Sequence, residues 1–304
     1  MSPSPAFANP PVEFLEGMEA MRKAEAARAA AYVMPAVKMR NVFIQGTDVA
    51  VPVRIYEPEV ESDLLRPLLI WHHGGAFTMG GLDQLESHVV SAEIAARANA
   101  IVVAVDYRLC DDEIKMPAPQ IDARDVAVWC FENSEKLGFD RHKVFIGGAS
   151  AGASLSASLS LILRDLHIPV TGVILIYPVA HYRALPVSDE LRAHCVGHRV
   201  FPDEFKVLHN PYLWPDTSKH NELYPFPGEA ADLGGQQKHL VIHADFDTLR
   251  ATGEPYADQL RADGVEVIES IELGTEHGYL NLIPSESEGM DRTLNTMVQF
   301  ITAN

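Results

Sequence analysis

The chain has 304 residues, without low-complexity runs or internal repeats, so a single domain spanning residues 1–304 with one sizeable core is expected. The formal net charge of −18 at pH 7 would repel nucleic-acid phosphates and anionic lipid surfaces. Composition therefore predicts no nucleic acid and no membrane as partner, and favours a small-molecule substrate.

The cysteines and the N-terminal stretch indicate the cellular setting. Cys110, Cys130 and Cys195 lack paired metal-ligand spacing, and their odd number gives no disulfide framework, so buried free thiols are predicted. The first residues lack a basic segment followed by an apolar one, and no later run approaches about 18 apolar residues. A soluble, cytoplasmic protein is expected.

The elements predicted along the chain alternate between strands and helices. Residues 12–32 predict a helix, and residues 41–56 predict two strands joined by a Gly-Thr-Asp turn. Short apolar runs predict buried strands at 67–71, 101–105, 144–146, 173–177 and 240–243, with a last strand at 266–273. Helical patterns occupy 85–98, 120–136, 151–166 and 253–262. This order predicts an α/β fold with a mostly parallel central sheet covered by helices on both faces.

Residues 181–237 interrupt that alternation and are rich in His, Pro, Tyr and acidic residues. An insertion at the carboxyl end of a strand lies where ligands bind in open α/β sheets, so we interpret it as a lid. An irregular surface excursion is the alternative.

The strongest chemical signal is a GxSxG sequence from Gly148 to Gly152, preceded by an apolar strand and followed by a helical pattern. Such a strand, sharp turn and helix would hold Ser150 in a strained conformation, with glycines needed where the strand and helix approach. Ser150 is the predicted nucleophile. The serines at 154, 156, 158 and 160 lie within the following helix and lack the turn.

A second glycine-containing segment, His72 to Phe77, follows the strand that ends at Trp71. Its adjacent glycines, Gly74 and Gly75, would let backbone N–H groups approach a ligand closely. Together with the N–H of Ala151 they predict an oxyanion hole with three donors. The alternative is a simple glycine-rich turn, and for His73 a structural role in holding this loop is preferred.

The partners of the serine are expected later in the chain, in the order Ser, Asp, His. Asp247 follows the strand at 240–243, and His277 follows the last strand. His277 would take the proton of Ser150, and Asp247 would hold the imidazole tautomer. Asp245 and Glu276 compete for the acid role.

These motifs resemble the hormone-sensitive-lipase-like (HSL) esterases, a family of the α/β-hydrolase fold, over most of the chain. The matching segments are His73–Gly75, Asp106–Leu109, Pro117–Pro119, Gly148–Gly152, Asp247–Arg250, Tyr256–Ala257 and His277–Gly278. The resemblance implies that Asp247 is the acid, that Gly74, Gly75 and Ala151 are the oxyanion donors, and that no metal or organic cofactor takes part. It also implies a cap formed by the insertion, residues 181–237, and by an N-terminal element, approximately residues 1–40.

Three positions depart from the family pattern. Ala76 replaces the usual third glycine, Ala149 replaces the usual acidic residue before the serine, and Cys110-Asp111-Asp112 replaces Ala-Pro-Glu. These departures leave the three triad residues in place and bear on substrate range and pH optimum.

The predicted function is hydrolysis of small, short-acyl carboxylic esters through a Ser-His-Asp triad and an acyl-enzyme intermediate. Phe77 and Tyr279 are candidate substrate-binding residues that would limit acyl length. The alternatives are an amidase or peptidase or a lipase with the same triad, and a non-catalytic ligand receptor on this fold. The His277 base argues against the receptor, which needs none.

Overall fold

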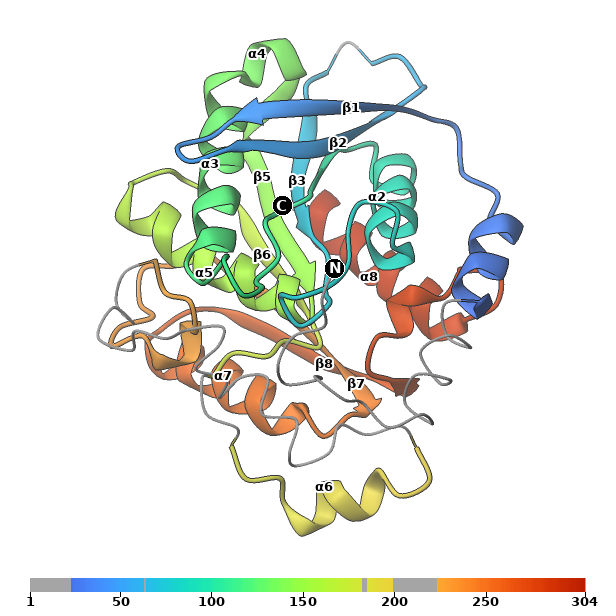
Figure 1. Cartoon of the computed structure of the whole chain (residues 1–304), viewed down its shortest axis with the longest axis vertical. Helices are drawn as coiled ribbons and strands as arrows, with labels where there is room; N and C mark the ends of the chain where they lie inside the picture. The colour runs from blue at the N-terminus through green and yellow to red at the C-terminus, as the bar shows by residue number, and fades with distance from the viewer. Residues whose placement is uncertain (1–22, 63, 182–184, 199–222, 304) are drawn as a thin grey trace.

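The computed structural model describes residues 23–62, 64–181, 185–198 and 223–303. The described strands form one sheet in the order β1-β2-β4-β3-β5-β6-β7-β8 (Figure 1). Their bounds are β1 Val37–Gln45, β2 Ala50–Pro58, β3 Arg66–His72, β4 Ile101–Val105, β5 Phe139–Ala149, β6 Gly172–Ile176, β7 His239–Phe246 and β8 Val267–Glu276. β2 pairs antiparallel with β1 and β4, and the other neighbours pair parallel. The prediction of a mostly parallel sheet is confirmed.

Helices cover both faces of this sheet, as Figure 1 shows. The helices are α2 Leu85–Arg97, α3 Ala118–Glu132, α4 Ser134–Leu137, α5 Ala151–Asp165, α6 Asp189–His194, α7 Arg250–Ala262 and α8 Glu288–Thr302. Residues of α3, α5 and α7 pack in one apolar core, and residues of α2 and α8 pack in a second. On β3, Leu68 and Ile70 face the first core, whereas Leu69 and Trp71 face the second. A strand buried on both faces is apolar at consecutive positions, which explains its unbroken apolar run.

The parallel strands place the chemical residues at one edge of the sheet. Ser150 follows β5, Asp247 follows β7, and His277 follows β8. The segment from His73 to Phe77 follows β3, the parallel neighbour of β5. Because these strands run in the same direction, the loops after them meet at the carboxyl edge of the sheet.

Two helical features differ from the sequence expectation. The single helix expected at 120–136 is broken at Asn133, whose side-chain amide donates to the Trp129 carbonyl and competes with continued helix. Helix α8 was not expected, although Met290, Leu294, Met297 and Ile301 have helical spacing and Ser287 caps its first turn.

The expected cap lies only partly within the described residues. Residues 23–31 are helical, and the remainder of the expected helix at 12–32 lies outside the described residues. Arg28 forms an ion pair with Glu286, and the Tyr32 hydroxyl donates to Glu93 of α2. Of residues 181–237, the structure describes α6 and a short 3-10 helix at Pro227–Glu229.

Candidate active site

Ser150 occupies the sharp turn between β5 and α5. Its backbone has φ 53° and ψ −118°, outside the usual regions for a residue with a side chain, and its N–H donates to the Ile176 carbonyl. A Cβ atom added at Gly148 would lie 2.3 Å from the Gly152 carbonyl oxygen. A Cβ atom added at Gly152 would lie 2.1 Å from the His72 carbonyl oxygen. The two glycines therefore allow the close approach of backbones that the turn requires.

Substitution of Gly152 by alanine should lower stability through this crowding. Overpacking against backbone atoms costs about 1–3 kcal/mol, occasionally more. Gly264→Ala is the comparison variant, because its added Cβ would contact nothing within 4 Å, so that its φ of +81° supplies backbone strain alone, a cost of about 1–2 kcal/mol. Thermal and urea unfolding should rank Gly152→Ala as the less stable variant, and equal losses would contradict the crowding argument.

The three residues of the proposed triad lie in one chain of hydrogen bonds. The Nε2 atom of His277 lies 2.9 Å from the Ser150 Oγ, and its Nδ1 lies 2.7 Å from the Asp247 Oδ2. The other oxygen of Asp247 accepts the Leu249 N–H at 2.9 Å. Asp247 and His277 are buried, whereas Ser150 is half-buried. Three residues far apart in sequence thus meet with the geometry of a nucleophile, a base and an orienting acid.

The two competing carboxylates bind other histidines. Asp245 lies 2.8 Å from the Nε2 of His194 in α6, and its second oxygen accepts the Gly274 N–H at 2.9 Å. Glu276 lies 3.1 Å from the Nδ1 of His198. Both histidines belong to the insertion. The two carboxylates therefore attach the insertion to the ends of β7 and β8, which lead into Asp247 and His277.

His73 holds the loop after β3. Its Nδ1 lies 2.6 Å from the Gly74 carbonyl, its ring stacks on Tyr107 at 4.5 Å, and its own carbonyl accepts the Tyr107 hydroxyl. Burial lowers the pKa of His73 to about 4, so it is neutral at pH 7. These contacts agree with the structural role expected for His73.

The backbone of this loop differs from the sequence expectation at Gly74. The Gly74 N–H donates to the Oε1 of Glu86 at 2.6 Å, so it is not free to bind an oxyanion. Gly75, Ala76 and Phe77 have positive φ values of 121°, 52° and 63°. Alanine at position 76 therefore adopts a conformation that favours glycine, the residue that the family pattern has there.

Glu86 is a residue that sequence reasoning missed. It lies in the first turn of α2 and is 2% exposed. An acidic residue at a helix N-terminus is ordinarily explained by the helix dipole, so nothing in the local pattern indicates that its side chain points inward.

The candidate pocket residues Phe77 and Tyr279 lie in different apolar clusters. Phe77 belongs to a cluster with Cys110, Met116, Val179, Phe226 and Ala151, the residue after Ser150. Tyr279 instead belongs to the core beneath α2 and α8, where its hydroxyl bonds the Thr293 hydroxyl at 2.6 Å.

The Tyr279 ring packs edge-on against Tyr177, whose own ring lies 4.7 Å from that of His277. Tyr279 therefore packs against Tyr177, which in turn contacts His277, and it belongs to a different apolar cluster from Phe77. The role of Phe77 and Tyr279 as substrate-binding residues stays a prediction.

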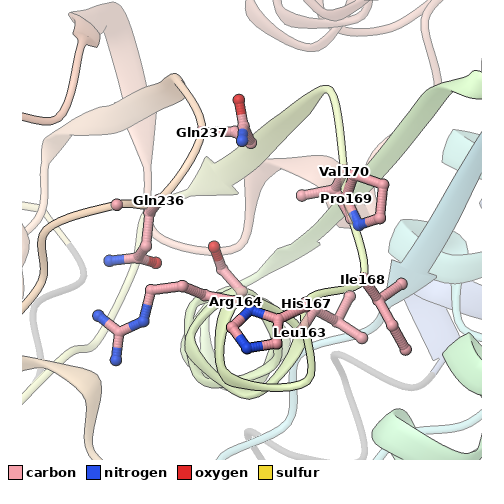
Figure 2. A pocket seen from close by; sticks show the side chains of 10 residues that line it. Leu163, Arg164, His167, Ile168, Pro169, Val170, Gln236 and Gln237 are labelled. Atoms are coloured by element: carbon pink, nitrogen blue, oxygen red, sulfur yellow. The ribbon is translucent and has the colours of Figure 1, made fainter.

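A cavity of about 270 Å³ lies away from this site. Figure 2 shows its lining, which comes from the last turns of α5, from the loop between α5 and β6 and from the loop before β7, and includes Arg164, His167 and Gln236. An α-helix rises about 1.5 Å per residue, so Arg164 lies about 20 Å along α5 from Ser150. The Arg164 guanidinium already donates to the Asp232 and Gly234 carbonyls. This cavity is separate from the triad.

The three cysteines are free and buried, as expected. Burial raises the pKa of Cys110 to about 12, so this thiol is un-ionised at neutral pH. Over the described residues, no group of His, Cys, Asp and Glu side chains has an arrangement that could hold a metal ion. In the same part of the chain, no helix is long and apolar enough to cross a membrane.

Comparison with known proteins identifies the family. A family model of the alpha/beta hydrolase fold matches residues 69–281, which is more than half of the chain. The chain belongs to this family, and its resemblance to the HSL-like esterases is confirmed.

Several relatives are named as esterases. The carboxylesterase NlhH of Mycobacterium tuberculosis is 34% identical over 275 residues, covering 88% of this chain and 83% of that protein. An arylesterase of Saccharolobus solfataricus is 28% identical over 249 residues, covering 81% of this chain and 78% of that protein. The solved structure of an esterase from the archaeon Pyrobaculum calidifontis superposes with a TM-score of 0.82 at 27% identity, covering 94% of this chain and 92% of the other.

Proposed function

We propose that this protein is a serine carboxylesterase that hydrolyses small, short-acyl esters. The observation that carries this proposal is the continuous hydrogen-bond chain from the Ser150 hydroxyl through His277 to Asp247. A serine hydroxyl is a weak nucleophile until a base accepts its proton, and this arrangement supplies the base and its orienting acid. The esterase relatives support the same activity.

In the first half of the reaction, His277 accepts the Ser150 proton while the serine oxygen attacks the ester carbonyl. The tetrahedral intermediate collapses, His277 returns the proton to the departing alkoxide, and the alcohol leaves an acyl-enzyme. In the second half, His277 activates a water molecule that releases the acid and restores Ser150.

The developing oxyanion requires backbone donors close to Ser150. Ala151 begins α5, so its N–H has no carbonyl one turn earlier in its own helix. We assign the N–H groups of Ala151 and Gly75 to the oxyanion, because Gly74 donates to Glu86. The next N–H of the loop, that of Ala76, is the candidate third donor.

The cap assignment also belongs to this proposal. Helix α6 is attached to the end of β7 through the His194 contact with Asp245, and Cys195 at its end is buried. We propose that residues 181–237 and the N-terminal element, approximately residues 1–40, form a cap on a single domain. Parts of both segments lie outside the described residues. A cytoplasmic location is likewise a prediction.

The packing beside Ala151 supports the proposed preference for short acyl chains. Each additional buried methylene adds about 0.8 kcal/mol of binding, so a preference for short chains needs a steric limit. The side chain of Phe77 is 1% exposed, and Phe226 packs in the same cluster, so this side of the nucleophile is already filled.

A series of p-nitrophenyl esters from acetate to dodecanoate, in solution and as emulsions, tests the proposal. We expect activity to peak at short chains in true solution and to show no jump when the substrate forms an interface. Phe77→Ala should move the optimum to longer chains. A sharp rise on long-chain emulsions would indicate a lipase, and faster cleavage of a matched anilide than of its ester would indicate an amidase.

A further inference from the structure

The carboxylate of Glu86 lies behind the oxyanion loop and is fully engaged. Its Oε1 accepts the Gly74 N–H at 2.6 Å and the Gln84 side-chain amide at 2.9 Å. Its Oε2 accepts the Tyr177 hydroxyl at 2.9 Å. The backbone of Glu86 is held as well, because its carbonyl accepts the Trp71 indole N–H and its N–H donates to Asn281.

We propose that Glu86 is a positioning residue for ester hydrolysis, which holds the Gly74 N–H so that the Gly75 N–H is directed at the substrate oxyanion of the tetrahedral intermediate bonded to Ser150. This inference rests on the proposed esterase function. Gly74 lies between the Glu86 carboxylate and Ser150, because a Cβ added at Gly74 would be 2.4 Å from the Glu86 Oε1 and 3.1 Å from the Ser150 Cβ. The bond from Glu86 to Gly74 therefore fixes the peptide immediately before the proposed donor.

The loop needs such an anchor because its backbone is strained. Three consecutive residues, Gly75, Ala76 and Phe77, have positive φ, and the last two carry side chains. Strained conformations persist only where the surrounding structure holds them. Charge-assisted hydrogen bonds to a carboxylate are roughly twice as strong as neutral ones, so a buried carboxylate is a suitable anchor.

The same carboxylate also reaches the ring beneath the catalytic base. Tyr177 donates its hydroxyl to Glu86 and places its ring 4.7 Å from the ring of His277, at an interplanar angle of 56°. One side chain thus connects the oxyanion loop after β3 to the residue that supports His277. Misplacement of Glu86 would affect both parts of the site together.

Retention of a charged group at this position has a cost in stability. Burial raises the pKa of Glu86 to about 6, so the carboxylate is still mainly ionised at pH 7, but its ionised form is less stable in the fold than in water. A raised pKa contributes stability below the ordinary value near 4.5, and this contribution is lost as the pH rises through about 6. The other titratable groups around it are Tyr177, Tyr107 and His277, and burial raises the pKa of both tyrosines, which are neutral at pH 7.

Glutamine at position 86 keeps the shape and removes this cost, so Glu86→Gln should fold at neutral pH at least as stably as the wild type. Glutamine has only one acceptor oxygen. When that oxygen accepts the Gly74 N–H, the NH₂ group of the glutamine faces the Tyr177 hydroxyl. The hydrogen bond to Gly74 is then made to a neutral oxygen and is weaker than the bond to a carboxylate. The loop should then be held less firmly although the protein is folded.

The test compares Glu86→Gln with Glu93→Gln in steady-state hydrolysis of a short p-nitrophenyl ester. Glu93 is a matched control, because it also lies on α2 and accepts a tyrosine hydroxyl, that of Tyr32, away from the triad. Complete loss of an oxyanion donor costs about 10²–10³ in kcat, so we expect Glu86→Gln to lose about 10- to 100-fold. KM should change by less than about two-fold, since the donor acts on the transition state.

A trifluoromethyl ketone, which forms a tetrahedral adduct with the serine, provides the second readout. Its inhibition constant should rise for Glu86→Gln by the factor by which kcat/KM falls, and should be unchanged for Glu93→Gln. An unchanged kcat and inhibition constant in folded Glu86→Gln, an effect on KM alone, or an equal loss in Glu93→Gln would overturn the inference. A wild-type protein without Ser150-dependent ester hydrolysis would instead overturn the proposed function.

Discussion

Ester turnover should fall by about 10⁶ in kcat when Ser150 is replaced by alanine, the loss found when the nucleophile of a serine triad is removed. Alanine keeps the Cβ, and the turn is also held by the backbone bond to the Ile176 carbonyl, so the fold should be retained. The Ser150 hydroxyl makes its side-chain hydrogen bond to His277. Its loss removes the attacking atom and little packing.

Steady-state hydrolysis of p-nitrophenyl butyrate measures this loss, with thermal unfolding as the test of the fold. Ser154→Ala is the control, because Ser154 is a buried serine one helical turn later in α5. It should be almost as active as the wild type. Residual activity of Ser150→Ala within about ten-fold of wild type would mean that Ser150 is not the nucleophile.

The second large effect is expected at Asp247. The Asp247 carboxylate accepts a hydrogen bond donated by the Nδ1 of His277, which leaves Nε2 free to act as the base. The amide of an asparagine at this position could instead donate to Nδ1, which would place the imidazole proton on Nε2. The equivalent change in another serine triad lowers kcat by about 10⁴ with the geometry intact, and we expect a loss of that order here. The 2.7 Å separation of Asp247 from His277, inside a buried site, supports our proposal that Asp247 is the acid.

Asp245→Asn is the matched control, since it makes the same change two residues away. Asp245 bonds His194 and the Gly274 N–H, so its replacement should weaken the attachment of α6 and cost less than about ten-fold in kcat. Measurement of kcat and KM for both variants decides between the acids. A larger loss in Asp245→Asn would assign the acid role to that residue instead.

The sequence predicted the fold because its signals are local. Buried parallel strands such as β4, Ile101–Val105, are continuous apolar runs, and the sharp turn at Ser150 needs glycines at fixed positions. Chain order was also informative, because the carboxyl ends of parallel strands gather Ser150, Asp247 and His277 at one edge. These features depend on spacing rather than on side-chain direction.

The features that were missed depend on tertiary contacts. Nothing near Gly74 in sequence shows that its N–H bonds Glu86, twelve residues later and on a different element. The direction of the Tyr279 hydroxyl is set by Thr293 of α8, a helix that was itself not expected. Contacts between residues on different elements, such as these two hydrogen bonds, depend on tertiary packing, which cannot be read from a single sequence.

The central claim is that Ser150 is the nucleophile, and covalent labelling tests it most directly. A fluorophosphonate ester reacts with a serine only when a base removes its proton, and it leaves a stable adduct on that oxygen. Intact mass spectrometry of the wild type should show one adduct, and peptide mapping should place it on Ser150. Ser150→Ala should remain unlabelled, whereas Ser154→Ala should label as the wild type does. An adduct on any other residue, or labelling that persists in Ser150→Ala, would contradict the assignment.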